Sequence, residues 1–314
     1  MSDKYLFTPW PSLASFGKSI TLPGGTLFYY DCKPANTDAA SGNASGNASS
    51  DASCETSGLP TLVFIHGLGD EADSWRHVIP LLTAKGYRCI AIDLPGFGRS
   101  LWKGKISISN HANAVISVIQ HCAENPVVLI GSSMGCGVAQ LAALRFPALV
   151  KSLILVGGCF PIKGKMSMGI LLFSMFGHRW YRSFRQNHEA AWKSLYAYYN
   201  DIEALSDEDK TFLRNRVIAR VESDNQERGY FSSLRSITLS LMFARWPLSR
   251  KIKKYKGKID LLWGEKDRVM PVEKSEPFRK LKPDVALSII AGAGHLPQQD
   301  KPQETVEAIL AVLG

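Results

Sequence analysis

The chain has 314 residues, about twice the usual length of one domain, although a single α/β unit with an insertion can reach this size. Hydrophobic residues make up 45% and charged residues 21% of it, a composition that excludes collagen-like, fully disordered and disulfide-scaffold proteins. Lysine and arginine number 37 against 28 aspartate and glutamate, so the net charge of +9 is the unusual bulk property.

The N-terminal residues show no targeting or membrane-spanning pattern. Prolines, a glycine and a lysine interrupt residues 9–18, and no stretch approaches the roughly 18 apolar residues of a membrane span. The sequence therefore predicts a cytoplasmic protein. The six cysteines lack metal-ligand spacing, so we predict small buried hydrophobes and neither a metal nor another cofactor; a Cys32–Cys54 disulfide is the less favoured alternative.

The first predicted element is a β-hairpin. Residues 16–22 and 26–33 are rich in β-branched and aromatic residues, and they flank the turn signal Pro23-Gly24-Gly25. Residues 34–58 then consist mainly of Ala, Ser, Gly, Asn, Asp and Thr. Such a segment buries too little apolar surface to offset the entropy of ordering, so we predict a flexible low-complexity insertion.

Beyond residue 58, short apolar runs alternate with stretches of helical periodicity, which is the pattern of parallel strands joined by crossover helices. The predicted strands cover residues 61–65, 88–92, 127–130, 152–156, 259–263 and 286–290. Between residues 158 and 256 no such run repeats, and the composition is helical and rich in aromatic side chains. We predict a core of residues 1–158 and 257–314, with residues 159–256 inserted between consecutive strands.

A candidate nucleophile follows the third of these strands. Residues 131–135 spell G-x-S-x-G around Ser133, between a predicted strand and a predicted helix. In such an elbow the serine has a strained backbone and its close neighbours are small, so that the hydroxyl stands clear of the turn. The helix N-terminus behind it favours a developing negative charge.

The acid and base partners are expected after the last two strands, because ligands of open α/β sheets bind at the carboxyl ends of the strands. His295 follows the last strand through a Gly-rich turn and is the predicted base. Asp267 lies in the turn after the strand 259–263 and is the predicted acid. Glu265 and Asp260 compete for that role, but Asp260 lies inside the strand and Glu265 is early in the turn.

The loop after the strand 61–65 reads His66-Gly67-Leu68-Gly69 and is the predicted oxyanion loop. We assign the backbone N–H groups of Leu68 and Met134 as the donors to a tetrahedral intermediate. His66 is expected to hold the loop in place.

These motifs, together with D-L-P-G-F-G-R-S at residues 93–100 and G-E-K-D-R-V-M-P at residues 264–271, resemble the α/β-hydrolase superfamily over about two thirds of the chain. The resemblance implies a mostly parallel eight-stranded sheet with helices on both faces, and a helical cap formed by residues 159–256. Cys136 departs from the family, since many relatives have a glycine there. One triad on this fold hosts many reactions, so the fold alone does not choose among them.

The segment 166–176 is the most lipophilic part of the predicted cap, and basic residues flank it. Its Met and Phe side chains suit an acyl chain, so we predict substrate contacts from Met168 and Phe173. Trp180 begins the aromatic-rich region that follows and is the third predicted contact; the alternative is that these aromatic side chains form the cap's own core. An ordinary cap helix packed on the core is the favoured interpretation of the segment 166–176, and contact with an anionic membrane surface is the alternative.

The sequence as a whole predicts a carboxylesterase or lipase-like serine hydrolase with a small hydrophobic ester substrate. Alternatives are a thioesterase, lactonase, C–C hydrolase, peptidase or acyltransferase on the same triad, or a non-catalytic binding protein. No nucleic-acid motif is present, and no nucleic-acid partner is predicted. Residues 151–260 hold 20 Lys and Arg against 10 Asp and Glu, with the densest run at 251–258, so we expect the cap to attract anions beside the entrance to Ser133.

Overall fold

The computed structural model describes residues 7–34, 58–123, 126–160, 168–243 and 245–314. Most of the predicted insertion at 34–58 lies outside these ranges, and so does Cys54. Four of the described cysteines, at positions 32, 89, 136 and 159, are buried, and Cys122 is partly buried.

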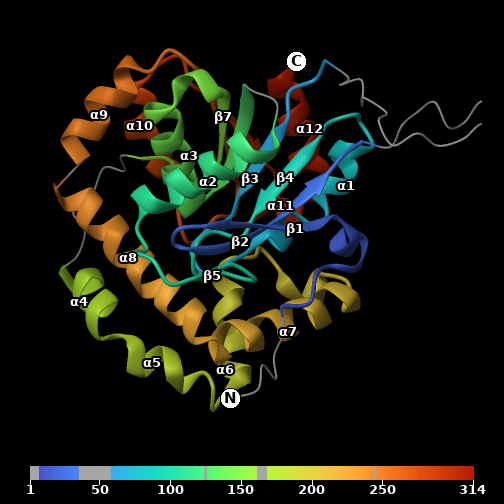
Figure 1. Ribbon diagram of the computed structural model, residues 1–314, viewed down its shortest axis with the longest axis vertical. Helices are drawn as coiled ribbons and strands as arrows, with labels where there is room; N and C mark the ends of the chain where they lie inside the picture. The colour runs from blue at the N-terminus through green and yellow to red at the C-terminus, as the bar shows by residue number, and fades with distance from the viewer. Residues whose placement is uncertain (1–6, 35–57, 124–125, 161–167, 244) are drawn as a thin grey trace, which may run out of the picture.

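A nine-stranded sheet forms the centre of the molecule (Figure 1). Eight strands run in the order β1-β2-β4-β3-β6-β7-β8-β9, and the short β5 pairs with β2. The pairs β1–β2, β2–β4 and β2–β5 are antiparallel, and all the other pairs are parallel. The strands are β1 (Gly17–Leu22), β2 (Gly25–Cys32), β3 (Leu62–Ile65), β4 (Cys89–Ile92), β5 (Leu101–Trp102), β6 (Val127–Ser132), β7 (Val150–Val156), β8 (Lys258–Gly264) and β9 (Ala286–Ile290).

The mostly parallel sheet, the hairpin and the six predicted runs are confirmed, with ends shifted by at most two residues. The prediction of eight strands missed β5, because a strand of two residues is too short to show the alternation of apolar and polar side chains.

Side chains of each central strand alternate between two apolar layers, as the two-residue period of a strand requires. On β3, Val63 and Ile65 face the layer under α2 and α3, whereas Leu62 and Phe64 face the layer under α1 and α12. Helices therefore cover both faces (Figure 1). The helices before β7 and after β8 are α1 (Val78–Thr83), α2 (Ile108–Cys122), α3 (Met134–Arg145), α10 (Glu276–Leu281), α11 (Pro297–Asp300) and α12 (Pro302–Leu313).

The chain between β7 and β8 is helical, and α4 to α7 lie beyond the carboxyl ends of the parallel strands (Figure 1). The helix α8 then runs along one side of the core to α9, which precedes β8. These helices are α4 (Met168–Phe176), α5 (His178–Ser183), α6 (His188–Lys193), α7 (Asp207–Glu222), α8 (Asp224–Phe243) and α9 (Arg245–Lys254). Short 3-10 helices are η1 (Pro11–Phe16), η3 (Ala72–Trp75), η4 (Pro147–Leu149), η5 (Ser194–Ala197), η6 (Ile202–Ala204) and η7 (Val272–Ser275).

Within the described ranges, no helix combines the length and the apolar character needed to cross a membrane.

Candidate active site

Ser133 lies in a sharp turn between β6 and α3. Its φ of 50° makes it the one non-glycine residue with a positive φ among the described residues. The turn closes tightly, since a Cβ added to Gly131 would lie 2.5 Å from the backbone of Gly135. The N–H of Ser133 donates to the carbonyl of Val156 at the end of β7, at 2.9 Å. The strained backbone persists because strand, helix and neighbouring strand fix it from three sides.

His295 and Asp267 meet at the ends of β9 and β8. His295 Nδ1 lies 2.7 Å from Asp267 Oδ2, and both side chains are almost fully buried. The other carboxylate oxygen, Oδ1, accepts hydrogen bonds from the N–H groups of Val269 and Met270 at 2.9 and 2.7 Å. The carboxylate is therefore fixed by its own turn while it orients the imidazole.

Glu265 and Asp260, the two alternatives to Asp267 as the acid, have other partners. Glu265 accepts a hydrogen bond from the N–H of Gly292 at 3.0 Å, and Asp260 lies 3.5 Å from Lys258 at the start of β8.

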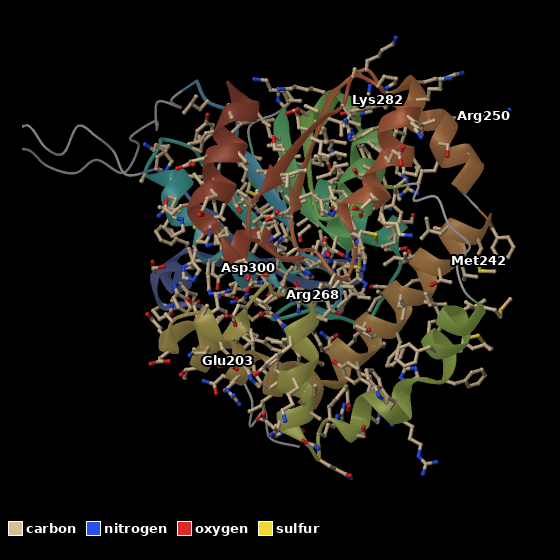
Figure 2. The ribbon with its side chains drawn as sticks, turned by 180° about the vertical axis from the view of Figure 1, so that it is seen from behind. Glu203, Met242, Arg250, Arg268, Lys282 and Asp300 are labelled. Atoms are coloured by element: carbon tan, nitrogen blue, oxygen red, sulfur yellow. The ribbon has the colours of Figure 1, made fainter. Side chains whose placement is uncertain are left out.

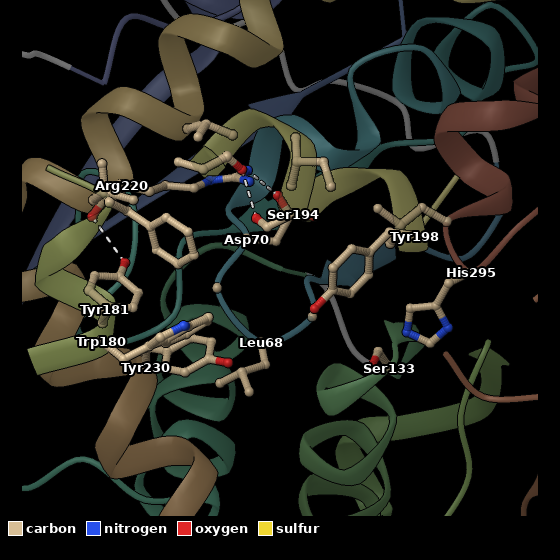
Figure 3. A pocket seen from close by; sticks show the side chains of 18 residues that line it. Leu68, Asp70, Ser133, Trp180, Tyr181, Ser194, Tyr198, Arg220, Tyr230 and His295 are labelled. Atoms are coloured by element: carbon tan, nitrogen blue, oxygen red, sulfur yellow. Dashed lines mark hydrogen bonds and ion pairs between the residues drawn. The ribbon is translucent and has the colours of Figure 1, made fainter. Parts of the chain in front are cut away.

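Ser133 and His295 line the same cavity, where the hydroxyl and the imidazole lie beside each other (Figure 3). No hydrogen bond joins these two side chains, both of which belong to the described residues; such bonds often tighten only when substrate binds. Gly157 (φ 61°) lets the chain pass closely behind the imidazole, because a Cβ there would lie 3.0 Å from the carbonyl oxygen and 3.4 Å from Nδ1 of His295.

The predicted oxyanion loop lies against the predicted nucleophile. A Cβ on Gly67 would be 3.4 Å from Cβ of Ser133, and Leu68 lines the cavity together with Ser133. Met134 is the first residue of α3, where backbone N–H groups lack an intrahelical acceptor. His66 is buried and fixes the loop: its Nδ1–H donates to the carbonyl of Gly67 at 2.7 Å, and its Nε2 accepts from the N–H of Leu94 at 3.0 Å.

The cavity above Ser133 has a volume of about 180 Å³ and a mostly apolar wall contributed by α5, α6, α7 and α8 (Figure 3). Engineered apolar cavities of ~150 Å³ admit benzene, so a ring or a short acyl chain fits here. The lining residues are Gly67, Leu68, Gly69, Asp70, Ser133, Trp180, Tyr181, Phe184, Ala191, Ser194, Leu195, Tyr198, Val217, Arg220, Val221, Tyr230, His295 and Leu296.

Of the three predicted substrate contacts, Trp180 lines the cavity, whereas Phe173 and Met168 do not. Phe173 packs inside the inserted helices, with its ring 5.2 Å from that of Trp180 and 5.7 Å from that of Phe231. Met168 begins α4 and points into solvent. The lipophilic pattern of the segment did not show which face of each helix meets the cavity.

The sequence did not predict the polar end of the cavity, where Arg220 of α7 binds the two acidic residues that directly follow the predicted oxyanion loop. Its guanidinium donates to both carboxylate oxygens of Glu71, at 2.8 and 2.9 Å, and also to Asp70. Burial alone would lower the pKa of Arg220, but the charges of Glu71 and Asp70 raise it above its ordinary value. Burial raises the pKa of the nearby Tyr230 to about 12, so its hydroxyl stays neutral. The partners are about 150 positions apart, and no local motif links them.

The histidine turn is also tied to the inserted helices. The N–H of His295 donates to the carbonyl of Tyr198 at 2.8 Å. The carboxylate of Asp300 accepts from the N–H groups of Gly294 at 2.6 Å and Asn200 at 3.0 Å.

Cys136 fits behind the elbow, where its thiol contacts the carbonyls of Gly131 at 3.1 Å and Val156 at 3.4 Å. Burial raises the pKa of this thiol well above its ordinary value. Over the described part of the chain, no group of three or more His, Cys, Asp or Glu side chains is arranged to hold a metal ion.

The densest basic run is not beside Ser133, contrary to the prediction. It covers the end of α9 and the start of β8, and β8 carries the chain from Lys258 towards Asp267. The run therefore lies near the amino ends of the parallel strands, whereas the cavity lies at their carboxyl ends. The helix α9 is accordingly at the far end of the molecule from α6 (Figure 1).

Comparisons with known proteins agree with this architecture. Residues 60–302 match the family model described as alpha/beta hydrolase fold. The uncharacterized hydrolase YugF of Bacillus subtilis is 30% identical over 264 residues, which cover 81% of this chain and 90% of that protein. A 2-hydroxy-6-oxo-6-phenylhexa-2,4-dienoate hydrolase of Comamonas testosteroni is 27% identical, with 77% of this chain and 84% of that protein covered.

Among solved structures, a putative lipase (lip1) from Acinetobacter baumannii matches with a TM-score of 0.73 at 20% identity, covering 95% of this chain and 90% of that one. The family match spans more than half of the chain, and it includes the strands β3 to β9 together with Ser133, Asp267 and His295. This chain belongs to the alpha/beta hydrolase fold family.

Proposed function

We propose that the chain is a serine hydrolase that cleaves ester-like bonds through an acyl-enzyme on Ser133. One observation carries the proposal: a serine in a strained turn lies next to a histidine held by a buried carboxylate, in the wall of an apolar cavity. A serine hydroxyl is a weak nucleophile at neutral pH, and an adjacent, oriented base is what activates it.

In this mechanism His295 takes the proton of the Ser133 hydroxyl as Oγ attacks the carbonyl carbon, and Asp267 stabilises the imidazolium. The carbonyl oxygen becomes an oxyanion, with the N–H groups of Leu68 and Met134 as its donors. His295 gives its proton to the leaving alkoxide, the alcohol departs, and the acyl group remains on Ser133. Water then attacks this ester as His295 takes its proton, the acid is released, and the proton returns to Ser133.

The cavity supports a neutral, hydrophobic acyl group. Arg220 is the one cationic side chain among the lining residues, and Asp70 and Glu71 already bind it. A carboxylate placed there would meet two anions, which argues against a dienoate substrate of the kind that the Comamonas relative's name specifies. We propose Trp180 as a contact of the acyl group, because its ring is part of the wall.

A fluorophosphonate probe tests the nucleophile directly. We expect covalent labelling of the folded protein at Ser133, and no labelling of Ser133→Ala. Ser194→Ala is the matched control, because Ser194 also lines the cavity but donates its hydroxyl hydrogen to the carbonyl of Ala191 at 2.7 Å. Folded wild-type protein that resists the probe would refute the serine-hydrolase assignment.

A panel of p-nitrophenyl esters with increasing acyl length tests the substrate class. We expect kcat/KM to rise until the acyl group fills the cavity and to fall beyond that length. Succinyl hemiesters, which carry a carboxylate, should be poor substrates. Efficient cleavage of a dienoate C–C bond with no esterase activity would favour the C–C hydrolase alternative.

A further inference from the structure

The burial pattern of α4 is the reverse of that expected for a surface helix of a globular protein. Its small polar residue Ser174 is the buried one, whereas Met168, Leu172, Met175 and Phe176 are exposed. A surface helix normally buries its apolar stripe and exposes its polar face. Phe173 packs among the inserted helices, but most of the other apolar side chains of α4 lack the cover that the fold usually provides.

Neighbouring α8 enlarges this surface. It packs beside α4, with Arg235 donating to the carbonyl of Ser174 at 2.9 Å, and it exposes Phe243 near its end. Phe176 and Phe243 are 71% and 75% exposed. Half of the fourteen exposed large hydrophobic side chains in the described ranges lie on these two helices. We call these seven side chains the α4/α8 apolar face: Met168, Ile170, Leu172, Met175, Phe176, Leu239 and Phe243.

The sequence stretches that carry the α4/α8 apolar face are strongly basic. Residues 157–188 and 228–259 hold 14 Lys and Arg and neither Asp nor Glu. These stretches supply α4, α5, most of α8 and all of α9, where Lys251, Lys253 and Lys254 are exposed. The C-terminal end of α8 and the whole of α9 lie along one edge of the molecule. Figure 2, which shows the molecule from behind, labels Met242 of α8 and Arg250 of α9 on this edge. Glu227 and Asp224 at the start of α8 neutralise Arg182 and Arg185, whereas Lys251, Lys253 and Lys254 make no ion pair with a described carboxylate.

We propose that the α4/α8 apolar face and the neighbouring basic helix α9 dock on an anionic lipid surface. Apolar side chains that enter the headgroup region, combined with lysines that meet anionic headgroups, are the two components of peripheral membrane binding. A second copy of the chain would place two cationic surfaces against each other. A nucleic acid would satisfy the lysines but would leave the apolar face in water.

Docking in this way brings one wall of the cavity close to the lipid. Trp180 is half exposed and also lines the cavity, and its ring contacts that of Phe173 in the helix that carries most of the apolar face. The docking surface does not depend on the proposed esterase activity, because vesicle binding is measured without catalysis.

The test is flotation of the full-length protein with vesicles of phosphatidylcholine alone or of equal parts phosphatidylcholine and phosphatidylglycerol. We expect flotation with the anionic vesicles only, weakened by salt. A lysine contributes about 1 kcal/mol near such a surface, so Lys251→Gln, Lys253→Gln and Lys254→Gln together should weaken binding about 100-fold. The apolar variant Leu172→Ser, Met175→Ser and Phe176→Ser should abolish flotation at the same salt concentration.

Matched controls lie on other surfaces. Leu101→Ser with Ile289→Ser removes two exposed apolar side chains, and Lys85→Gln with Lys280→Gln removes two exposed charges; neither pair should change flotation. Far-UV circular dichroism verifies that each variant is folded.

Three results would overturn the proposal. They are no flotation of the wild type, an apolar variant that floats like the wild type, and a dimer in solution that dissociates when Phe176 becomes serine. The second result together with tight heparin binding would instead identify a polyanion site.

Discussion

Arg220 is the side chain whose removal most directly tests how the inserted helices stabilise the candidate site. It donates three hydrogen bonds to Glu71 and Asp70, which directly follow the oxyanion loop, and Glu71 is buried. Removing one partner of a buried ion pair leaves an uncompensated charge and costs about 3–5 kcal/mol. Arg216 still lies 3.3 Å from Glu71 in Arg220→Met, which keeps an apolar chain of similar length, so we predict a loss at the lower end of this range, about 3 kcal/mol, in the free energy of unfolding.

The loss should depend on pH through Glu71. Burial alone would raise the pKa of the Glu71 carboxyl, but the charges of Arg220 and then Arg216 lower it below its ordinary value. In the wild type the carboxylate therefore stabilises the fold above the unfolded pKa of about 4.3, and this contribution fades as the pH falls through the lower folded value. In Arg220→Met the folded pKa of Glu71 is higher than in the wild type, because only Arg216 still lowers it, so the penalty is full at neutral pH and declines as the carboxyl becomes protonated.

Urea denaturation at pH 7 and near pH 4 measures the difference between wild type and variant, which should be largest at pH 7. Arg214→Met is the matched control on the same helix, because Arg214 and its partner Glu189 are exposed and 3.1 Å apart, and exposed pairs contribute about 0–1 kcal/mol. A loss below about 1 kcal/mol for Arg220→Met, or a loss that ignores pH, would refute the reasoning and show that the pair behaves as a solvated one.

Three further predictions concern the site itself. Asp267→Asn should lower kcat by about 10⁴ with the fold retained, because an amide favours the wrong imidazole tautomer; steady-state kinetics showing less than a tenfold loss would contradict the role of Asp267. Gly157→Ala should lower both kcat and the melting temperature, since the added Cβ would lie 3.0 Å from the carbonyl oxygen of His295; unchanged kinetics would mean that the histidine tolerates displacement. Ser133→Gly should be more stable than Ser133→Ala by about 1 kcal/mol, because only alanine keeps the strain of a positive φ; equal melting curves would count against strain in the elbow.

The sheet could be predicted because each strand is recognisable from its own short stretch of sequence. Each central parallel strand is buried on both faces, so it appears as a short run of mainly apolar residues, and β6 and β8 stand out even without their neighbours. The candidate triad could be placed for the same reason, since each member follows a strand end. The choice of Asp267 over Glu265 used only its position in the turn, and the structure places its carboxylate 2.7 Å from His295 Nδ1.

The cavity could not be predicted to the same extent, because its walls depend on how separate helices pack. Met168 and Phe173 lie in the lipophilic segment and Trp180 follows it closely, yet the first is exposed, the second is packed among the inserted helices and the third lines the cavity. A rotation of about 100° separates successive positions on a helix, so the facing direction of each side chain follows from tertiary contacts rather than from composition.

The arginines and the lysines of the inserted segment have different roles. Arg216 and Arg220 bind Glu71, Asp73 and Asp70 of the core, and therefore contribute to the fold. Guanidinium is planar and weakly hydrated, so it pairs with buried carboxylates at lower cost than an ammonium group does. The lysines at the end of α9 are exposed, as a strongly hydrated ammonium favours. The net charge of +9 is thus a poor guide to binding by itself, and the exposed lysines of α9 are the part of it that lies beside an apolar face.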